Sequence, residues 1–483
     1  MRLRLNTSLV LPVTHKLIGI LWATAMVTLP VTSFRYYPFV GETTYVRPLA
    51  LYPVAIIIVI LVGQWLLGRR RVRIPGTALV LGLLVLVFLA SSVLGALHDP
   101  IPLRGQGYLG RALRAWSTLI IGLMFFVCAV AVTRTAEDIR YTVRWVLIGL
   151  CVTLVWSGLQ AVTFYTSLLD KEAVTHWQLA FSMRELVRTN RISGLAYEPA
   201  WLAAQIATIY APILLGAVLA GVSVTRAPWF EQLLLGLAFI VALATYSRGG
   251  ILITLFSTVL AVALFGRARL HSMGSWFSRG FRAGAREVVL RLLTAASLLA
   301  VLVGVLVFLG QKNYFRRLWE ISADTVGEYI IDINAGARSA YAVAAMEAYY
   351  RFPLTGVGLG ASGFYIYDNL PDWSLTTVPE IARQLSPANQ LFPNPKNLYV
   401  RLLAEAGLPA FILFIVFQFS VLGDSLSLLR QRGAIRLLAV AGVAAWVAIA
   451  LQNITQDSFA SPNLWLVPGM VAGAGFRWQE LPT

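Results

Sequence analysis

The stretch RRRVRIPGTALVLGLLVLVFLASSVLGAL (69–97) joins four arginines within five residues to a long apolar run. Residues 76–97 contain no charged side chain. A helix needs about 20 apolar residues to cross a lipid bilayer, so this run is long enough to do so. Arginine and lysine gather in the cytoplasmic loops of membrane proteins. The stretch therefore predicts a membrane-spanning helix that begins at the cytoplasmic side.

Similar apolar runs recur along the whole chain. Of its 483 residues, 58% are hydrophobic and 13% are charged, whereas about 25% are charged in ordinary soluble domains. Soluble cores also stop growing beyond roughly 250–300 residues. The composition therefore predicts an all-α polytopic membrane protein with about twelve transmembrane helices. The predicted spans are residues 17–34, 48–68, 76–97, 115–133, 145–166, 199–221, 229–246, 249–265, 289–310, 398–422, 437–455 and 462–476.

The basic residues between these runs indicate the orientation. Arginines cluster at residues 69–73, 134–144, 267–286 and 430–436, which all fall on the side of the N-terminus, and the short loops on the other side are poorer in basic residues. This pattern predicts that both termini are cytoplasmic. The net charge of +17 then reflects contact with anionic membrane lipids. We therefore expect no nucleic-acid partner.

Cysteine and histidine are scarce in this chain. Cys128 and Cys151 lie inside apolar runs, and the four histidines are scattered singly. This distribution predicts neither a disulfide framework nor a cluster of metal ligands. We expect no metal site and no cofactor.

Two long segments on the outer side interrupt the series of spans. Loops held by a rigid scaffold commonly carry function, so we expect the functional residues there. The predicted organisation is residues 1–166 with helices one to five, 167–198 as a first long periplasmic loop, 199–310 with helices six to nine, 311–397 as a large periplasmic loop of short helices, and 398–483 with the last three helices.

The first candidate cluster, RISGLAYEPAW (191–201), ends the first long loop and enters a helix. Arginine binds phosphate through two parallel hydrogen bonds, which suits Arg191 and its neighbour Arg188. Arg184, Arg188 and Arg191 are near helical spacing, so we expect an electropositive helix face.

Glu198 in the same cluster has two interpretations. Its charge complements the dipole of a helix that starts at Pro199, or its carboxylate accepts a proton from a hydroxyl at the membrane surface. Tyr197, beside it, is a candidate for substrate binding.

The second cluster, TYSRGG (245–250), lies between two apolar runs. An arginine at the membrane boundary is costly and by default indicates function. The two glycines permit a tight turn or the close approach of a ligand. Arg248 is therefore predicted to bind an anionic group.

The third cluster, NPKNLYVR (394–401), ends the large loop. Pro395 suits a helix start, which would place Lys396 and Asn397 in a first turn where the helix dipole disfavours cations. Their presence predicts an anionic partner, and the alternative for Lys396 is an ordinary lysine at the lipid interface. Arg401 follows one turn later and is a further binding candidate.

Upstream of this cluster, PLTGVGLG (353–360) contains a GxGxG pattern. No βαβ context surrounds it, so we expect a compact turn and no dinucleotide site. Arg338 precedes it and is another binding candidate. Together the three clusters place several cations and one or two carboxylates near one membrane face, which suits a diphosphate-bearing substrate with a stabilised leaving group.

The ordered motifs Arg191-x3-Leu195, Ser247-Arg248-Gly249, PLTGVGLG (353–360) and Asn397-x9-Gly407 resemble the bacterial O-antigen ligase/polymerase superfamily. The resemblance covers roughly residues 190–420. It implies a GT-C-like helical glycosyltransferase of the inner (cytoplasmic) membrane that uses undecaprenyl-diphosphate-linked glycans at the periplasmic face, without metal, and inverts an α-linked donor. A glycan acceptor is the implied partner, and a chain-length regulator is a further candidate.

One departure from the family pattern separates its two activities. Ligases of this superfamily carry a histidine directly before the asparagine of the Asn-x9-Gly motif, where this chain has Lys396. A protonated lysine cannot accept a proton, which favours a polysaccharide polymerase over a ligase acting on lipid A-core. In this interpretation Glu198 is the base or orients the acceptor, Arg191 and Arg248 bind the diphosphate with Arg338 in support, and Lys396 is an electrostatic partner of the diphosphate. A lipid-linked glycan transporter is the alternative from another class.

Overall fold

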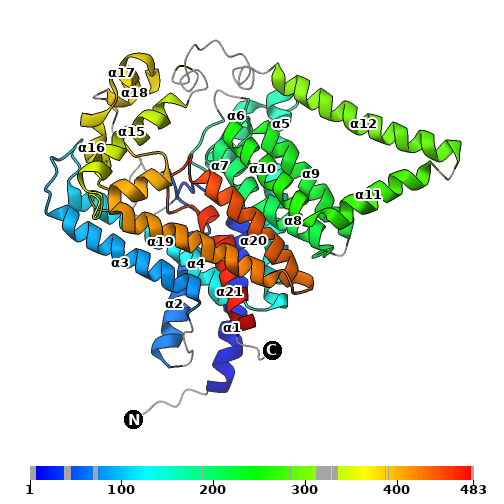
Figure 1. Ribbon diagram of the computed structural model, residues 1–483, viewed down its shortest axis with the longest axis horizontal. Coiled ribbons are helices and arrows are strands. Elements are labelled where there is room, and N and C mark those ends of the chain that lie inside the picture. Colours follow the sequence, from blue (N-terminus) through cyan, green and yellow to red (C-terminus); the bar gives the residue numbers. More distant parts are fainter. Residues whose placement is uncertain are drawn as a thin grey trace.

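A computed structural model describes residues 7–36, 45–68, 74–186, 190–225, 227–281, 284–311, 328, 335–386, 388–389 and 391–479 (Figure 1). Within these ranges the regular structure is helical, apart from two isolated β-bridges. The helices are α1 (Thr7–Thr28), α2 (Leu51–Leu66), α3 (Gly76–Ala96), α4 (Tyr108–Val132), α5 (Ala136–Tyr165), α6 (Lys171–Leu179), α7 (Pro199–Gln205), the π-helix η1 (Ile206–Tyr210), α8 (Ala211–Ala220), α9 (Pro228–Ala244), α10 (Arg248–Phe265), α11 (Arg267–Gly280), α12 (Ala285–Gly310), α15 (Gly336–Arg351), α16 (Gly363–Ile366), η2 (Tyr367–Asn369), α17 (Asp372–Thr377), α18 (Pro379–Leu385), α19 (Leu398–Leu428), α20 (Gly433–Gln452), η3 (Pro462–Leu464) and α21 (Leu466–Gln479).

Seven helical segments among the described residues are long and apolar enough to cross a membrane: α3, α4, α5, Pro199–Ala220, α10, α19 and α20. Two further apolar helices, α2 and α9, are shorter. This architecture is that of a polytopic membrane protein, as the composition predicts. Every predicted span overlaps a described helix, but the total of about twelve spans and the GT-C-like arrangement stay predictions.

Four predicted spans differ from the described helices by six residues or more at one or both ends. The fifth, 145–166, starts at Ala136 in α5, and the tenth, 398–422, ends at Leu428 in α19. The first, 17–34, corresponds to α1, which is described from Thr7 and ends at Thr28. Lys16 is exposed within it, because a long cationic side chain can reach the lipid interface from inside a helix. The fourth, 115–133, starts at Tyr108 instead, because Arg111 packs its guanidinium 3.8 Å from the centre of the Phe392 ring.

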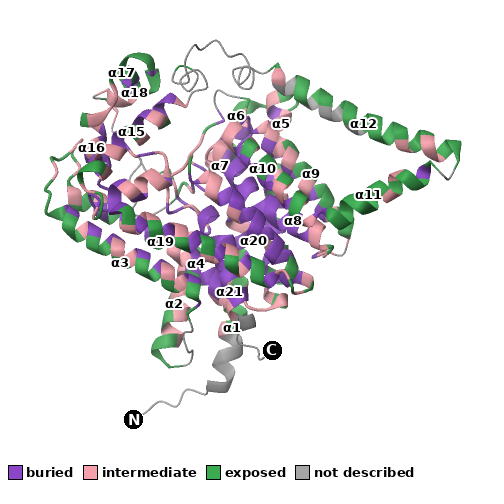
Figure 2. Ribbon diagram, in the orientation of Figure 1, coloured by how far each residue is buried: buried purple, intermediate pink, exposed green. Residues whose placement is uncertain are grey.

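The centre of the bundle is α20, which is buried along most of its length against α8, α10 and α19 (Figure 2). Small residues allow this close packing. A Cβ on Gly216 of α8 would lie 2.4 Å from the Leu437 carbonyl oxygen. Lipid provides little hydrophobic driving force between helices, so close backbone approach and dispersion stabilise their contact.

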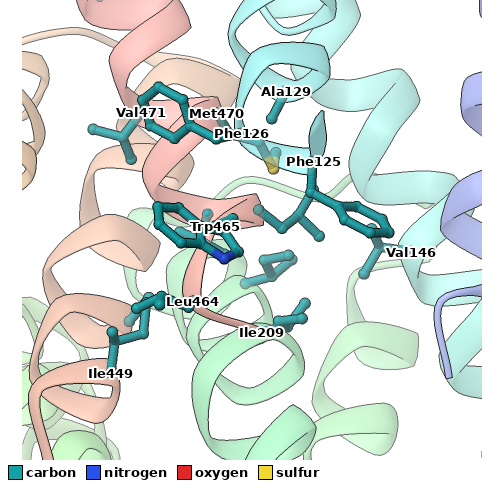
Figure 3. Close-up of a cluster of buried hydrophobic side chains, with 14 of the residues drawn as sticks. Phe125, Phe126, Ala129, Val146, Ile209, Ile449, Leu464, Trp465, Met470 and Val471 are labelled. Atoms are coloured by element: carbon teal, nitrogen blue, oxygen red, sulfur yellow. The ribbon is translucent and has the colours of Figure 1, made fainter. Parts of the chain in front are cut away.

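Trp465, at the start of the last helix, fills the space between α4, α20 and η1. Its ring lies among Phe125, Phe126, Ile209 and Ile449 (Figure 3). Its indole N–H donates to the Phe459 carbonyl at 2.6 Å, so the buried polar atom is satisfied.

The predicted compact turn at PLTGVGLG (353–360) is confirmed, and it packs against a break in α19. Gly407 (φ 72°, ψ −174°) interrupts that helix. The amide of Val357 donates to the Ala404 carbonyl at 3.0 Å, and that of Gly358 donates to the Glu405 carbonyl at 2.9 Å. The turn thus satisfies carbonyls that the break leaves without helical partners. It also fastens the α15–α18 segment (residues 335–386) to the bundle.

We predict that Gly356→Ala destabilises the protein by about 2–4 kcal/mol, since overpacking and a left-handed backbone each carry a cost. Gly356 has φ +62°, and a Cβ there would lie 2.3 Å from the Ala406 amide nitrogen. Denaturant unfolding in mixed micelles measures the change. Gly82→Ala in α3 is the matched control, because nothing lies within 4 Å of its Cβ position and alanine suits a helix. Equal stability of the two variants would contradict the packing role of the turn.

Candidate functional site

Three helix N-termini meet at one end of the bundle, which we call the loop face and define as the end where α3 and α5 finish and α7, α10 and α19 begin. A Cβ on Gly250 of α10 would lie 2.4 Å from the Ala203 Cβ of α7. Helix α19 begins beside the end of α20, because the Leu398 amide donates to the Asn453 carbonyl just after α20 at 2.8 Å. Helix α20 in turn packs on α10. The positive dipole end of each N-terminus favours anions, although the first three amides of α19 already bond Asn453 and Asn397.

The first and second clusters are joined at this face. The Arg191 Nε donates to the Thr245 carbonyl at 2.9 Å, and the Ile192 amide donates to the Ala244 carbonyl at 3.1 Å. Arg191 is half-buried there, and Arg248 is half-buried as the first residue of α10. The structure therefore brings together two of the residues predicted to bind diphosphate.

Gln160 of α5 holds this loop from beneath. Its Oε1 accepts from the amides of Ser193 (3.1 Å) and Gly194 (2.9 Å), and its Nε2 donates to the Gly194 carbonyl at 3.1 Å. Gln160 is fully buried. A buried amide with all its groups bonded rigidifies its surroundings, so Arg191 extends from a fixed backbone.

Glu198 stands at the N-cap of α7, but its side chain makes no capping hydrogen bond. Within the described ranges its half-buried carboxylate has no hydrogen bond or ion pair. Arg184 is close by, donating from Nη1 to the Tyr197 carbonyl at 2.8 Å. Burial lowers the pKa of the Arg184 guanidinium, the nearby Glu198 and Tyr197 oppose that shift, and Arg191 adds to it. Burial likewise raises the pKa of the Tyr197 hydroxyl, and Tyr45 and Glu198 raise it further.

The expectation of a helical face carrying Arg184, Arg188 and Arg191 is wrong for the first and last of these residues. Helix α6 ends at Leu179, and both arginines lie in irregular backbone. Arg188 lies outside the described residues. The backbone of Arg184 bonds side chains instead of other backbone groups: its carbonyl accepts from Gln178 Nε2 at 3.0 Å, and its amide donates to Ser182 Oγ at 3.3 Å.

Helix α19 begins at Leu398, so Lys396 and Asn397 precede its first turn instead of lying in it as predicted. Lys396 has φ +57°, a left-handed conformation that is strained for a residue with a Cβ. Its amide donates to Asp457 Oδ2 at 3.0 Å. Asn397 is the N-cap, and its Oδ1 accepts from the Tyr399 amide at 2.9 Å. In the described part of the chain the Lys396 ammonium has no hydrogen bond or ion pair.

Arg401 and Arg338 are placed differently from the other candidates. The Arg401 Nε bonds Glu405 Oε2 at 2.9 Å, and its Nη1 donates to the Asp457 carbonyl at 2.6 Å. Glu405 also accepts from Ser362 at 2.8 Å. Arg401 is thus committed to a buried network inside the protein. Arg338 is exposed on α15.

Residues 233–415 match the family model of the O-antigen ligase. This match supports the resemblance to the O-antigen ligase/polymerase superfamily that the motifs indicate. No curated protein matches the chain. The matched residues include Arg248, Lys396 and the break at Gly407, whereas Arg191 and Glu198 precede them.

No sequence pattern predicted Gln160 or Asp457, which also belong to this region. Both act on the site through hydrogen bonds to residues distant in sequence, and neither stands in a motif. A polar residue inside an apolar span was the available signal for Gln160. Among the described residues no group of three or more histidine, cysteine, aspartate or glutamate side chains could hold a metal ion, and the expected independence from metal stays a prediction.

We predict that Lys396→Gly stabilises the fold by about 1 kcal/mol relative to Lys396→Ala. Both variants lack the ammonium, but only glycine adopts the left-handed backbone without strain. Paired denaturant titrations in the same detergent measure the difference. Two variants of equal stability would show that the left-handed conformation is not retained in solution.

Proposed function

We propose that this chain is a periplasmic-face glycosyltransferase that polymerises undecaprenyl-diphosphate-linked oligosaccharide repeats into O-antigen or exopolysaccharide. The match of residues 233–415 to the O-antigen ligase family model supports an enzyme of this general type. The observation that supports the proposal is the Glu198 carboxylate, which lacks a partner among the described residues and lies within electrostatic reach of Arg184. Arg191, from the same loop, bonds the Thr245 carbonyl three residues before Arg248.

In this proposal the cations act on the leaving diphosphate. Negative charge grows on the diphosphate as the bond between the anomeric carbon and its oxygen breaks. Arg191 and Arg248 bind that charge through hydrogen bonds that strengthen as it develops, and the α10 N-terminus adds its dipole. Lys396 contributes a further positive charge from the start of α19. Arg188 and Arg338 are proposed supporting contacts to substrate.

Glu198 is the proposed base. Its carboxylate accepts the proton of the acceptor hydroxyl as the hydroxyl oxygen attacks the anomeric carbon from the face opposite the diphosphate. The new glycosidic bond forms as the diphosphate departs, so the configuration inverts. Tyr197 and Asn397, each next to a catalytic candidate, are the proposed contacts to the sugar.

Arg401 takes a role that differs from direct substrate binding. Its guanidinium holds Glu405 and the Asp457 carbonyl, and Asp457 in turn holds the Lys396 amide. We therefore regard Arg401 as a positioning residue that acts on the site through Asp457.

The proposal predicts transfer by the purified protein in nanodiscs, measured as a ladder of longer lipid-linked glycans formed without lipid A-core. Arg191→Ala and Arg248→Ala should each lower the rate by about 10²–10³-fold, as loss of a transition-state donor does. Glu198→Gln should lower it by about 10²–10⁴-fold, since the base is lost and the shape kept. Lys396→Ala should have a smaller effect, and EDTA none.

Arg351→Ala is the control for charge, because Arg351 is an exposed arginine on α15 that bonds Asn369, away from the candidate site. Product formed only on lipid A-core would make the protein a ligase despite Lys396. Movement of lipid-linked glycan across proteoliposomes without any transfer would overturn the enzyme proposal in favour of a transporter.

A further inference from the structure

The loop between α3 and α4 presents a rigid glutamine at the loop face. Leu103 and Gln106 exchange two backbone hydrogen bonds of 3.1 and 3.0 Å across a tight turn. Arg104 and Gly105 between them have φ of 52° and 70°. The Arg104 guanidinium donates to the carbonyls of Gln384 (2.7 Å) and Leu391 (3.0 Å). This turn is therefore locked to the chain that leads from α18 towards Lys396.

Two arginines on α4 share that glutamine. Arg111 Nη1 and Arg114 Nη1 donate to the same Gln106 Oε1 at 3.4 and 3.3 Å. These bonds are long and the acceptor is neutral. Like charges three residues apart on one helix repel each other. Within the described ranges neither arginine has an ion pair with a carboxylate, so the pair lacks a counter-charge.

Arg111 lacks a full set of hydrogen-bond partners more clearly than Arg114 does. Its Nε is buried and has no hydrogen-bond acceptor, which is a costly arrangement for a charged group. One face of its guanidinium is covered by the Phe392 ring at 3.8 Å. Its backbone is also enclosed, since a Cβ on Gly360 would lie 2.8 Å from the Arg111 carbonyl oxygen.

The acidic groups in electrostatic reach of Arg111 are Glu405 and Asp457. Glu405 is bonded to Arg401 and Ser362. Asp457 accepts the Lys396 amide through one carboxylate oxygen. Because these carboxylates bond other groups, the positive charge of Arg111 and Arg114 has no dedicated partner in the described structure.

We propose that Arg111, Arg114 and Gln106 form a second anion site, which binds the diphosphate of the lipid-linked acceptor glycan. The inference rests on the proposed polymerase function, in which donor and acceptor both carry a lipid diphosphate. The two sites draw on different elements: Arg191 bonds the Thr245 carbonyl just before α10 and Arg248 begins α10, whereas Arg111 and Arg114 lie on α4, where Arg111 packs on Phe392. The phosphate of a bulk phospholipid shares this chemistry, and the test separates the two sources.

The test counts undecaprenyl diphosphate molecules bound to the purified full-length protein by native mass spectrometry. We expect two per wild-type chain and one for Arg114→Gln. Arg114 is exposed, so this variant should fold normally. Arg111→Lys keeps the positive charge but loses the planar guanidinium that makes two parallel hydrogen bonds. It should weaken binding of the second undecaprenyl diphosphate molecule by about tenfold or more. Arg351→Gln is the control and should retain two.

Kinetics provide the second readout. With a long-chain donor and a labelled single-repeat acceptor, Arg114→Gln should raise the acceptor KM about tenfold and leave the donor KM unchanged.

Three outcomes would contradict the proposals. Two undecaprenyl diphosphate molecules bound with wild-type affinity to both the Arg114→Gln and Arg111→Lys proteins would overturn the second site. Displacement of the second molecule by excess phosphatidylglycerol would make it a bulk headgroup site and overturn the acceptor assignment. A wild-type protein that binds two molecules but transfers no glycan would instead refute the proposed function and leave the site standing.

Discussion

The break in α19 at Gly407 is the constraint on which the arrangement of the loop face depends. A helix interrupted at membrane depth exposes carbonyl groups that lipid cannot satisfy. Here Val357 and Gly358 supply the missing donors, and the Leu408 amide donates to the Pro353 carbonyl at 2.8 Å. These backbone hydrogen bonds fix the α15–α18 segment against the bundle. It also fixes the first turns of α19, where Arg401 and Glu405 pair, and so sets the place of Lys396 at the end of the large loop.

The same loop face contains strain that no packing requirement explains. Tyr246 and Lys396 both have left-handed backbone, and each stands shortly before the N-cap of a helix whose start faces the candidate site. Such a conformation costs about 1–2 kcal/mol for a residue with a Cβ. Strain of this kind persists where surrounding hydrogen bonds over-determine the backbone, and it gathers at functional sites. The bond from the Lys396 amide to Asp457 and the bond from Arg191 to the Thr245 carbonyl are restraints of that kind.

Apolar runs were enough to predict the helices, because in lipid the length of a run and its lack of charge largely determine whether it is helical. The motifs also indicated which loops carry cations. What the sequence could not show were the bonds that position those cations. Gln160 reaches Gly194 across 34 residues and Arg104 reaches Leu391 across 287, and no local pattern encodes either contact. Likewise, α4 extends beyond its predicted start and includes Arg111, which packs on Phe392, far along the chain.

The distribution of carboxylates gives the loop face its chemical asymmetry. Glu405 has a dedicated arginine partner and is almost fully buried, so it neutralises Arg401 and stabilises the fold. Glu198 has no such partner among the described residues, although Arg184 is within electrostatic reach. A carboxylate that is fully paired makes a poor base, because its partner stabilises the charged form. A site that must hold an anionic leaving group and also remove a proton needs cations in excess and one carboxylate outside an ion pair. Around α7 and α10 this chain meets both requirements, and around α4 it meets only the first, which is why we assign proton transfer to the former and anion binding alone to the latter.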